Sequence, residues 1–317
     1  VVLLLSKKDQ NVYSYFKDLS DRHFSIQSIC VTEAGNFLKN KETNKTEWSG
    51  KNRLGQYFGN VAMKANLKLG QINHTTELAG LKDVLVLGAD VTHPGVGSLE
   101  GCPSIAAVVG SVDDTGGKFL GDYRPQPSKE EIIRNFHYYV CRRICAWSRH
   151  NDGKLPARVL YYRDGVSSNQ YQAVLEQEVN KIPMAFQAYA VVNELSDPLK
   201  IKTTAVIVTK RHHTRFYPKE WTDAMDTNDN CFPGTLIDNT VTSPYFRDFF
   251  HQTHNAIKGT ARPAHYFVVK NEIGVSSNAI QDITQRLCYT YVRATLGVSY
   301  ASPAYYADRL CERGRCY

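Results

Sequence analysis

Residues 84–95 read VLVLGADVTHPG, an apolar run that ends on the carboxylate of Asp90 and is followed at once by Thr92, His93 and the breaker Pro94. A strand that passes through a core commonly gives way to Gly, Asn or Ser at its end. An acid at this point therefore either caps the turn or does chemistry. The residue alone leaves both interpretations open, and the choice depends on what the rest of the chain places beside it.

The runs after this stretch predict the order of strands and helices. SIAAVVGSVD (104–113) and GGKFLGDYRPQP (116–127) follow at short intervals, which predicts an antiparallel meander of three strands. The later predicted elements are a helix over 129–147 with Ile132, Phe136, Val140 and Ile144 on one face, a strand over 157–165, a long helix over 167–190 and a strand over 201–213. The order βββαβαβ is that of a ribonuclease H-like fold.

The first 80 residues have a different pattern. An apolar strand over 1–5, a helix over 12–24, a short apolar run over 26–31, an exposed polar loop over 40–56 and a helix over 57–70 are predicted. They make an αβ half-domain, and residues 71–83 are typical of a linker. VVLLL at the start is far shorter than the roughly 20 apolar residues of a membrane span. We expect it to be a core strand of a longer chain, and we expect no membrane partner.

The composition is that of an ordinary globular protein with a mild basic excess. Among 317 residues, 38 Lys and Arg stand against 31 Asp and Glu, which gives a net charge of +7 and weakly favours a polyanionic partner. The 8 cysteines are scattered without a CxxC pair. This pattern predicts reduced thiols in an intracellular, cytoplasmic protein.

Asp90 and Asp164 are the first candidates for catalysis. In a ribonuclease H-like fold the ends of the first and fourth strands lie side by side, so the two carboxylates are expected to face each other and repel. A pair of bridging Mg²⁺ ions, the usual arrangement for hydrolysis of a phosphodiester, would relieve that repulsion. The alternatives are a loop-capping role for Asp90 and a plain turn at Asp164-Gly165.

Other charged residues are as ambiguous when taken singly. Glu131 fits a capping box that Ser128 opens, and Asp308 fits a solvated helix. VTKRHHTRF (208–216) is consistent with a phosphate-tracking loop and, less well, with a zinc site, because it offers no Cys or acid at ligand spacing. Lys64 and Lys68, four apart on one helix, indicate either an exposed face or a bound anion.

Several motifs in one order resemble the Piwi domain of eukaryotic Argonaute proteins. They are LGADVTHPG, PSIAAVVGSVD, EEIIRNF, YYRDGVSSNQ, VTKRHHTRF, GTARPAHY, LCYTYVRAT and SPAYYADRL. Residues 1–80 resemble the C-terminal half of the adjoining Rossmann-like MID domain, and residues 81–317 resemble the Piwi domain itself. A fungal, quelling-type member is the subtype we expect.

The resemblance implies an RNA-guided endoribonuclease. It assigns the catalytic tetrad to Asp90, Glu131, Asp164 and Asp308, and it implies two divalent ions, Mg²⁺ or Mn²⁺, on Asp90, Asp164 and Asp308. Many animal members have His at the last position, so Asp308 is a departure, but Asp is also an oxygen ligand suited to Mg²⁺. Glu131 corresponds to the residue that the family swings in as a finger.

The same resemblance implies how a guide RNA is held. Its 5′ phosphate and first base would contact Tyr13, Lys17, Lys64, Lys68 and Arg313, where a glutamine common in the family is replaced near Ile29. SKKDQN (6–11) corresponds to the loop that senses the first base. The positions that would line the guide backbone are Arg211, His213, Arg215, His254, Arg262, Tyr291, Arg293, Ser299 and Tyr305.

Three functions are compatible with these residues. The first is cleavage of a complementary target RNA directed by a 5′-phosphorylated guide. The second is a guide-binding silencing module that does not cut and recruits partner proteins. Four acids at the tetrad positions favour the first. A guide-independent nuclease, the third, would not need Tyr13 and the lysines.

Overall fold

The computed structural model describes residues 1–32, 37–39, 46–48, 54–78, 80, 82–195 and 200–317. The chain divides into two compact units. The N-terminal unit comprises residues 1–73, 292–295 and 315–317, and the sheet unit comprises residues 74–291 and 296–314. The units divide after Asn73, whereas the predicted domain boundary follows residue 80. The assignment of the two parts to MID and Piwi domains stays a prediction.

The N-terminal unit contains a parallel strand pair and two helices. β1 (Val2–Leu5) pairs in parallel with β2 (Ile29–Thr32), and α1 (Gln10–Asp18) with the π-helical turn Leu19–His23 lies between them in sequence. α2 (Leu54–Lys68) stops just before Gly70, where the sequence predicts its end. The predicted loop over 40–56 lies largely outside the described residues. Within it, Thr46–Trp48 is not loop but strand β4, which pairs with β3 (Phe37–Lys39).

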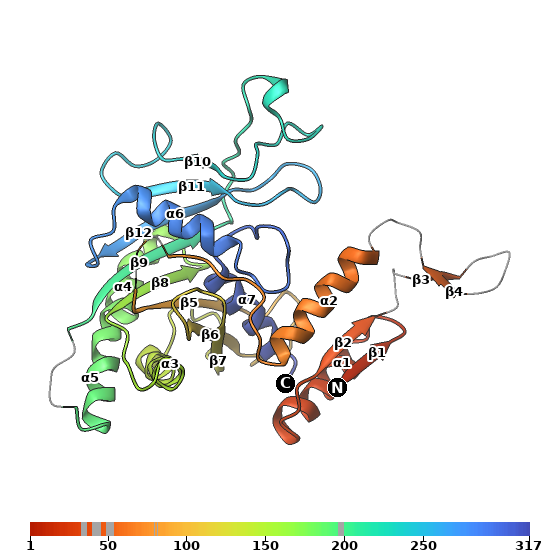
Figure 1. Cartoon of the computed structure of the whole chain (residues 1–317), viewed down its shortest axis with the longest axis horizontal. Coiled ribbons are helices and arrows are strands. Elements are labelled where there is room, and N and C mark those ends of the chain that lie inside the picture. The colour runs from red at the N-terminus through yellow and green to blue at the C-terminus, as the bar shows by residue number, and fades with distance from the viewer. Residues whose placement is uncertain (33–36, 40–45, 49–53, 79, 81, 196–199) are drawn as a thin grey trace. The chain divides into compact units, whose positions relative to one another are not determined.

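An eight-stranded mixed sheet organises the sheet unit, in the order β10-β11-β12-β9-β8-β5-β6-β7 (Figure 1). The strands are β5 (Val84–Thr92), β6 (Ser104–Ser111), β7 (Phe119–Gln126), β8 (Arg158–Asp164), β9 (Lys202–Thr209), β10 (Thr235–Ile237), β11 (Asp248–Gln252) and β12 (Ala264–Asn271). β5, β6 and β7 form the predicted antiparallel meander, and β8 and β9 join β5 in parallel. The ribonuclease H-like order is confirmed, and β10 to β12 extend it by antiparallel strands that the sequence pattern did not predict.

Helices cover both faces of this sheet. They are α3 (Phe136–His150), α4 (Tyr171–Gln177), α5 (Ile182–Val192), α6 (Ser277–Cys288) and α7 (Ser302–Gly314), with 3-10 turns at Ser168–Gln170, Val179–Lys181 and Trp221–Asp223. Successive side chains of a strand point to opposite faces. Leu85 and Leu87 accordingly pack with α3, α4 and α5, whereas Val84 and Val86 pack with α6 and the start of α7.

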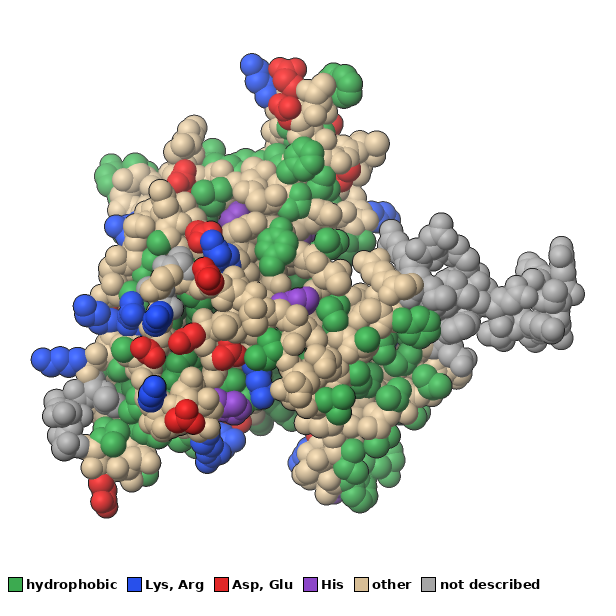
Figure 2. Space-filling view, in the orientation of Figure 1, with side chains coloured by type: hydrophobic (Ala, Val, Ile, Leu, Met, Phe, Trp, Pro, Cys, Tyr) green, Lys and Arg blue, Asp and Glu red, His purple; other side chains and the backbone are tan. Residues whose placement is uncertain are grey.

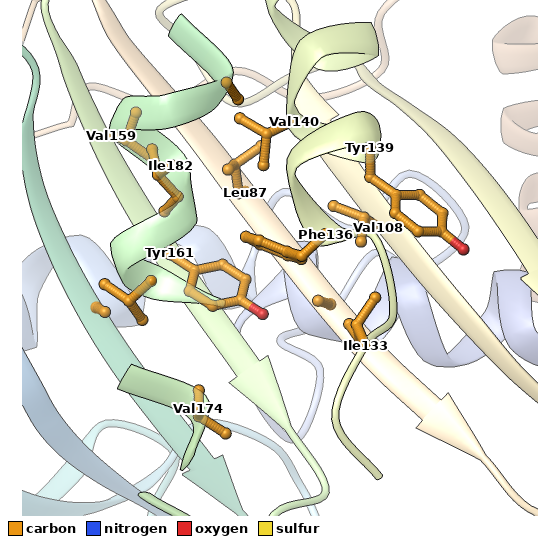
Figure 3. Close-up of a cluster of buried hydrophobic side chains, with 14 of the residues drawn as sticks. Leu87, Val108, Ile133, Phe136, Tyr139, Val140, Val159, Tyr161, Val174 and Ile182 are labelled. Atoms are coloured by element: carbon orange, nitrogen blue, oxygen red, sulfur yellow. The ribbon is translucent and has the colours of Figure 1, made fainter. Parts of the chain in front are cut away.

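The core beneath α3 is built from the apolar face that the sequence predicts. Phe136, Val140 and Ile144 are buried against β5, β6 and β8, and Figure 3 shows Phe136 between Leu87 and Tyr161. The rings of Phe136 and Tyr161 are 5.2 Å apart. Each such side chain contributes about 1.5 to 3 kcal/mol by leaving water.

The predicted start of this helix is wrong by seven residues. Residues 129–135 form turns, with left-handed φ values of +65° at Lys129 and +54° at Asn135, so Ser128 and Glu131 do not form a capping box. Hydrogen bonds with Gln126, at the end of β7, and with Ser104, on β6, hold this segment instead. Gln126 Nε2 donates to the carbonyls of Glu130 and Ile132, and the Lys129 N–H donates to Ser104 Oγ.

The predicted helix over 167–190 is interrupted. α4 ends at Gln177, Glu178 departs from helical backbone angles with φ −113° and ψ −64°, and α5 begins at Ile182 after a 3-10 turn. The side chain of Glu178 is fully buried beneath this break. The interruption therefore delivers a carboxylate into the core, which a regular amphipathic helix would have kept at its surface.

All 8 cysteines have free thiols. Among the described residues, no helix combines the length and apolarity that crossing a membrane requires.

Gly88 permits the close approach of β5 and α7, and we expect Gly88→Ala to destabilise the sheet unit by at least about 1 to 3 kcal/mol. A Cβ there would lie 2.1 Å from the carbonyl carbon and oxygen of Pro303 and 2.7 Å from the nitrogen of Ala304, and backbone cannot step aside cheaply. The check is urea unfolding of the variant against Gly95→Ala, whose Cβ meets nothing within 4 Å. Equal stability of the two variants would contradict the packing described here.

Candidate active site

The alternation of side chains along β5 and β8 brings Asp90 and Asp164 to the same face of the sheet. Asp90 lies on the side of Val84, Val86 and Gly88, which α7 covers, and Asp164 lies on the side of Leu160 and Tyr162. The two strands pair in parallel, and the last paired residues are Ala89 and Arg163. Asp90 and Asp164 come directly after these two residues, at the same level of the sheet. The predicted proximity of the two carboxylates is thus present.

One cavity of about 480 Å³ brings the four predicted acids together. Asp90 and Asp164 come from the ends of β5 and β8, Asp308 comes from α7, and Glu131 comes from the turns before α3. The other lining residues are Val91, Thr92, His93, Pro94, Gly165, Thr209, Lys210, Arg211, Arg262 and Tyr300. Two strands, one helix and one turn segment therefore each supply one carboxylate to a common space.

Gly165 makes room for this convergence. Its φ is +90°, a left-handed conformation that glycine adopts without a steric penalty. A Cβ at this position would lie 3.0 Å from Asp90 Oδ1 and 3.8 Å from Glu131 Oε1. The carboxylate of Asp90, from β5, and that of Glu131, from the turns before α3, thus both lie beside Gly165.

Burial and mutual repulsion disfavour the charged forms of these acids. Burial raises the pKa of Asp90 well above its usual range, and the charges of Asp164 and Asp308 raise it further. Burial and the charge of Asp308 raise the pKa of Asp164 to about 6. A divalent cation in the cavity would reverse this penalty, because it favours the ionised carboxylates.

Glu131 is held by two side chains that sequence reasoning missed. His93 Nε2 lies 2.8 Å from Glu131 Oε2, and Arg163 Nη2 donates to Glu131 Oε1 at 2.9 Å. Arg163 also donates to the Glu131 carbonyl at 2.6 Å, and the other His93 nitrogen lies 2.8 Å from Ser104 Oγ. A cation inside the apolar run of β8 is the signal that could have identified Arg163.

Asp308 has a partner on its own helix. Arg309 donates to Asp308 Oδ2 through Nη2 at 2.7 Å and through Nε at 3.1 Å, and it also pairs with Glu312. Within the described part of the chain, no three His, Cys, Asp or Glu side chains are arranged closely enough to hold a metal ion. The acids share a cavity without forming a preassembled ligand set. The zinc alternative for 208–216 gains no support from this arrangement.

Cations border the acids on the side of β9. Lys210 and the exposed Arg211 and Arg262 line the cavity. Burial and the charge of Arg262 lower the pKa of Lys210 to about 8, against the opposing charges of Asp164 and Asp308. Over β5, β8 and β9, acidic and basic side chains are interspersed on the face shown in Figure 2. The cations next to the acids are therefore not part of a large, purely basic surface on this face.

The remaining residues predicted to line a guide backbone lie in different settings. His213 is exposed, whereas Arg215 is half-buried and donates to the carbonyls of His212 and Thr214. Burial and Lys210 lower the pKa of His254 to about 4, so this imidazole is neutral at pH 7. Ser299 and Tyr291 are buried, and the Tyr291 ring lies 4.6 Å from that of Tyr305. Half-buried Arg293 belongs to the N-terminal unit.

The predicted 5′-end residues occupy two helices of the N-terminal unit, and one lies in the sheet unit. Tyr13 and Lys17 are one turn apart on α1, and Lys64 and Lys68 are one turn apart on α2. Lys17 is 3% exposed, and its ammonium donates to Ser28 O and Oγ, both at 2.7 Å. Ile29 is buried in β2. Arg313 lies near the end of α7, in the sheet unit.

Comparisons with known proteins agree with the fold and the motifs. The family model for the Piwi domain matches residues 1–317. Protein argonaute 2 of Oryza sativa subsp. japonica is 34% identical over 327 residues, which cover 98% of this chain and 30% of that protein. The chain thus spans about 30% of the length of such a curated relative.

Two solved structures are similar over 99% of this chain. The C-terminal lobe of a budding yeast Argonaute gives a TM-score of 0.86 at 34% identity, with 62% of that chain covered. Kluyveromyces polysporus Argonaute with a guide RNA gives a TM-score of 0.86 at 34% identity, with 35% of that chain covered. The quelling-type subtype stays a prediction. The chain belongs to the Piwi-domain family and is a homologue of the Argonaute proteins.

Proposed function

We propose that this protein acts in RNA silencing, where it binds a small guide RNA by its 5′ phosphate and hydrolyses a complementary target RNA with Mg²⁺ or Mn²⁺. The convergence of Asp90, Glu131, Asp164 and Asp308 on one cavity carries the proposal. The similar Kluyveromyces polysporus Argonaute was solved with a guide RNA, which supports RNA as the partner.

The donor set fits a pair of hard divalent ions. Asp90, Asp164 and Asp308 offer only oxygen ligands, which Mg²⁺ and Mn²⁺ prefer. Burial and neighbouring acids disfavour the charged forms of Asp90 and Asp164. Cations bound between these carboxylates would stabilise the charged forms. When bound, the ions would make water a nucleophile near neutral pH and neutralise charge on the leaving oxygen. To bind an ion, the Asp308 carboxylate would have to release its hydrogen bonds with Arg309.

Glu131 is the fourth acid of the cavity, and Arg163 and His93 orient its carboxylate. Both side chains hold the Glu131 carboxylate at the cavity, near Asp90 and Gly165. A carboxylate fixed this way is ready to accept a proton or a hydrogen bond from water without reorganising. The turns before α3 serve this purpose better than a helix would, because the Glu131 carbonyl is free to bind Arg163.

Cations next to the acids suit a phosphodiester backbone. Arg211 and Arg262 are exposed and line the same cavity, so they can contact phosphates on either side of the bond to be cut. Such contacts position a strand and carry no sequence information. We infer that base pairing with the guide supplies the sequence information, as it does in other guided nucleases.

In the N-terminal unit, paired lysines support recognition of the guide end. Lys64 and Lys68 stand four residues apart on α2, a like-charge pair that an anion would stabilise. A 5′ phosphate is dianionic at neutral pH and can accept from several ammonium groups. Tyr13 would stack on the first base, which contributes about 1 to 3 kcal/mol without reading its identity.

Asp90→Asn and Asp164→Asn should each reduce Mg²⁺-dependent cleavage of a guide-matched target by at least about 1,000-fold, because each removes a carboxylate that holds an ion. Guide affinity should stay within about twofold of the wild-type value. Single-turnover cleavage and filter binding measure the two quantities. The matched control is Asp152→Asn, an exposed acid in the turn after α3 where the left-handed backbone accepts Asn.

Cleavage that survives Asp90→Asn or Asp164→Asn would contradict the assignment of the cavity. A wild-type protein that binds guide but cuts no target would instead indicate the second function, a guide-binding silencing module that recruits partners.

A short RNA with a 5′ phosphate should bind at least about tenfold more tightly than the same RNA with a 5′ hydroxyl, because the phosphate adds charge-assisted hydrogen bonds. The double variant Lys64→Ala, Lys68→Ala should lose this preference. Lys154→Ala, Lys202→Ala is the matched control, since both lysines are exposed and lie in the sheet unit. Equal wild-type affinities for the two RNAs would contradict anchoring by the 5′ phosphate.

A further inference from the structure

A second, open cavity of the sheet unit is formed by the neighbours of Glu131 in the chain. Its volume is about 490 Å³, and it is lined by residues 130 and 132–135 of the turns before α3, by Gln177 at the end of α4 and by Lys181 just before α5. Within residues 130–135, only Glu131 lines the candidate active site. The turns before α3 therefore present Glu131 to one cavity and its neighbours to the other.

Hydrogen bonds connect the wall of this second cavity to the side chains that hold Glu131. The N–H of Ile133 donates to Glu178 Oε1 at 2.9 Å, and Glu178 forms the buried ion pair with Arg163. Arg163 in turn binds the carbonyl and the carboxylate of Glu131. Ile133 and Phe136 belong to the same core (Figure 3). A molecule that fixes the turns before α3 would therefore also fix Glu131.

The polar groups of the second cavity suit a carboxylate. In the part of the chain that the structure describes, no partner binds the Lys181 ammonium or the side-chain amides of Asn135 and Gln177. Arg134 donates to Glu130 Oε1 at 2.8 Å, so these two charges neutralise each other and Lys181 is the unneutralised charge of the cavity. Ammonium and amide N–H groups donate, and a carboxylate accepts through both of its oxygens. One cation matches a monoanionic carboxylate better than a dianionic phosphate.

Ile132 gives the same cavity an apolar wall. Its side chain is half-buried and packs against the core beneath α3. Ligand sites usually combine an apolar lining with a few convergent polar groups that fix orientation. The ligand class that fits is therefore a carboxylate attached to an apolar group. A small organic acid has this chemistry, and so does an acidic residue beside apolar residues in a peptide.

We propose that the second cavity binds a carboxylate carried on an apolar group, and that its occupant stabilises the position of Glu131. The carboxylate would accept from Lys181, with Asn135 and Gln177 as further donors, and the apolar group would cover Ile132. Coupling between two sites is reciprocal, so an intact Glu131 would in turn strengthen binding of the ligand. Binding itself does not depend on the proposed function. An effect of the ligand on cleavage does rest on it.

The first test is binding of phenylacetate, followed by methyl NMR of protein labelled at isoleucine. We expect the methyl signals of Ile132 and Ile133 to shift with a dissociation constant of about 1 mM or less. The neutral phenylacetamide should bind at least about tenfold more weakly, because it forms no charge-assisted hydrogen bond with Lys181. Equal affinities of the wild-type protein for the acid and the amide would overturn the site.

Lys181→Met should weaken phenylacetate binding by the same factor of about ten, since it removes the charge and keeps the length of the side chain. Lys154→Met is the matched control, because Lys154 is an exposed lysine of the sheet unit outside the second cavity. Wild-type affinity in Lys181→Met would contradict the assigned ligand contact.

A blocked peptide, acetyl-Phe-Glu-Phe-amide, separates the two sources of such a carboxylate. Tighter binding of the peptide than of phenylacetate would indicate an acidic segment of a protein partner, and tighter binding of phenylacetate would indicate a small organic acid. Unchanged Ile132 and Ile133 signals with both probes would overturn the proposal.

Coupling is tested with Glu131→Gln, which removes the carboxylate that Arg163 and His93 hold. Phenylacetate should bind this variant at least about fivefold more weakly, the lower end of typical coupling between sites. Asp308→Asn is the control, because it changes another acid of the candidate active site and leaves the turns before α3 intact. Wild-type affinity in Glu131→Gln would overturn the coupling. Since every readout is binding, a wild-type protein that cuts no target would count against the proposed function alone.

Discussion

The buried ion pair between Arg163 and Glu178 is the contact on which the architecture of the cavity depends. Both side chains are fully buried, and Arg163 Nε lies 3.1 Å from Glu178 Oε2. Glu178 also accepts from the Tyr161 hydroxyl at 2.7 Å and from the Ile133 N–H at 2.9 Å. Removal of one partner of such a pair costs about 3 to 5 kcal/mol, since the other charge is left uncompensated.

The pair connects three segments that are far apart in sequence. Through its other nitrogens Arg163 binds the carbonyls of Glu131 and Asp164 and the Glu131 carboxylate. One hydrogen-bonded network therefore joins the turns before α3, the end of β8 and the break between α4 and α5. Hydrogen bonds to charged side chains, rather than apolar packing, fix the position of Glu131. The pleat of β5 and β8 directs Asp90 and Asp164 to one face of the sheet, opposite to the face of Arg163.

Part of this arrangement could be predicted from the sequence. The spacing of apolar runs predicts βββαβαβ, and that order alone makes the ends of β5 and β8 neighbours, so Asp90 and Asp164 follow from topology. Glu131 and Asp308 could be assigned only by resemblance, because locally they look like helix acids. Tyr300 gave no signal, and Lys210 was marked only as part of the cationic run 208–216. The proximity of both residues to the acids arises from tertiary packing between β8, β9 and the segment before α7.

The errors have a common physical cause. The sequence around Ser128 has the residues of a helix start, yet the helix begins at Phe136. Side chains of Gln126, Ser104 and Arg163 bind backbone groups of residues 129–132, and Ser104 and Arg163 do so from other strands of the sheet. The predicted helix over 167–190 is likewise interrupted at Glu178, whose carboxylate forms the buried ion pair with Arg163. In both places a buried polar network outweighs local propensity, and both places border the candidate site.

The most direct measurement of the central claim is the position of the cut as a function of the guide. Two guides whose complementarity to one target differs by a single-nucleotide shift are loaded in turn, and the target products are mapped at nucleotide resolution. The account predicts one cut per guide, displaced by one nucleotide between the guides and absent without divalent metal. A cut whose position ignores the guide would contradict it.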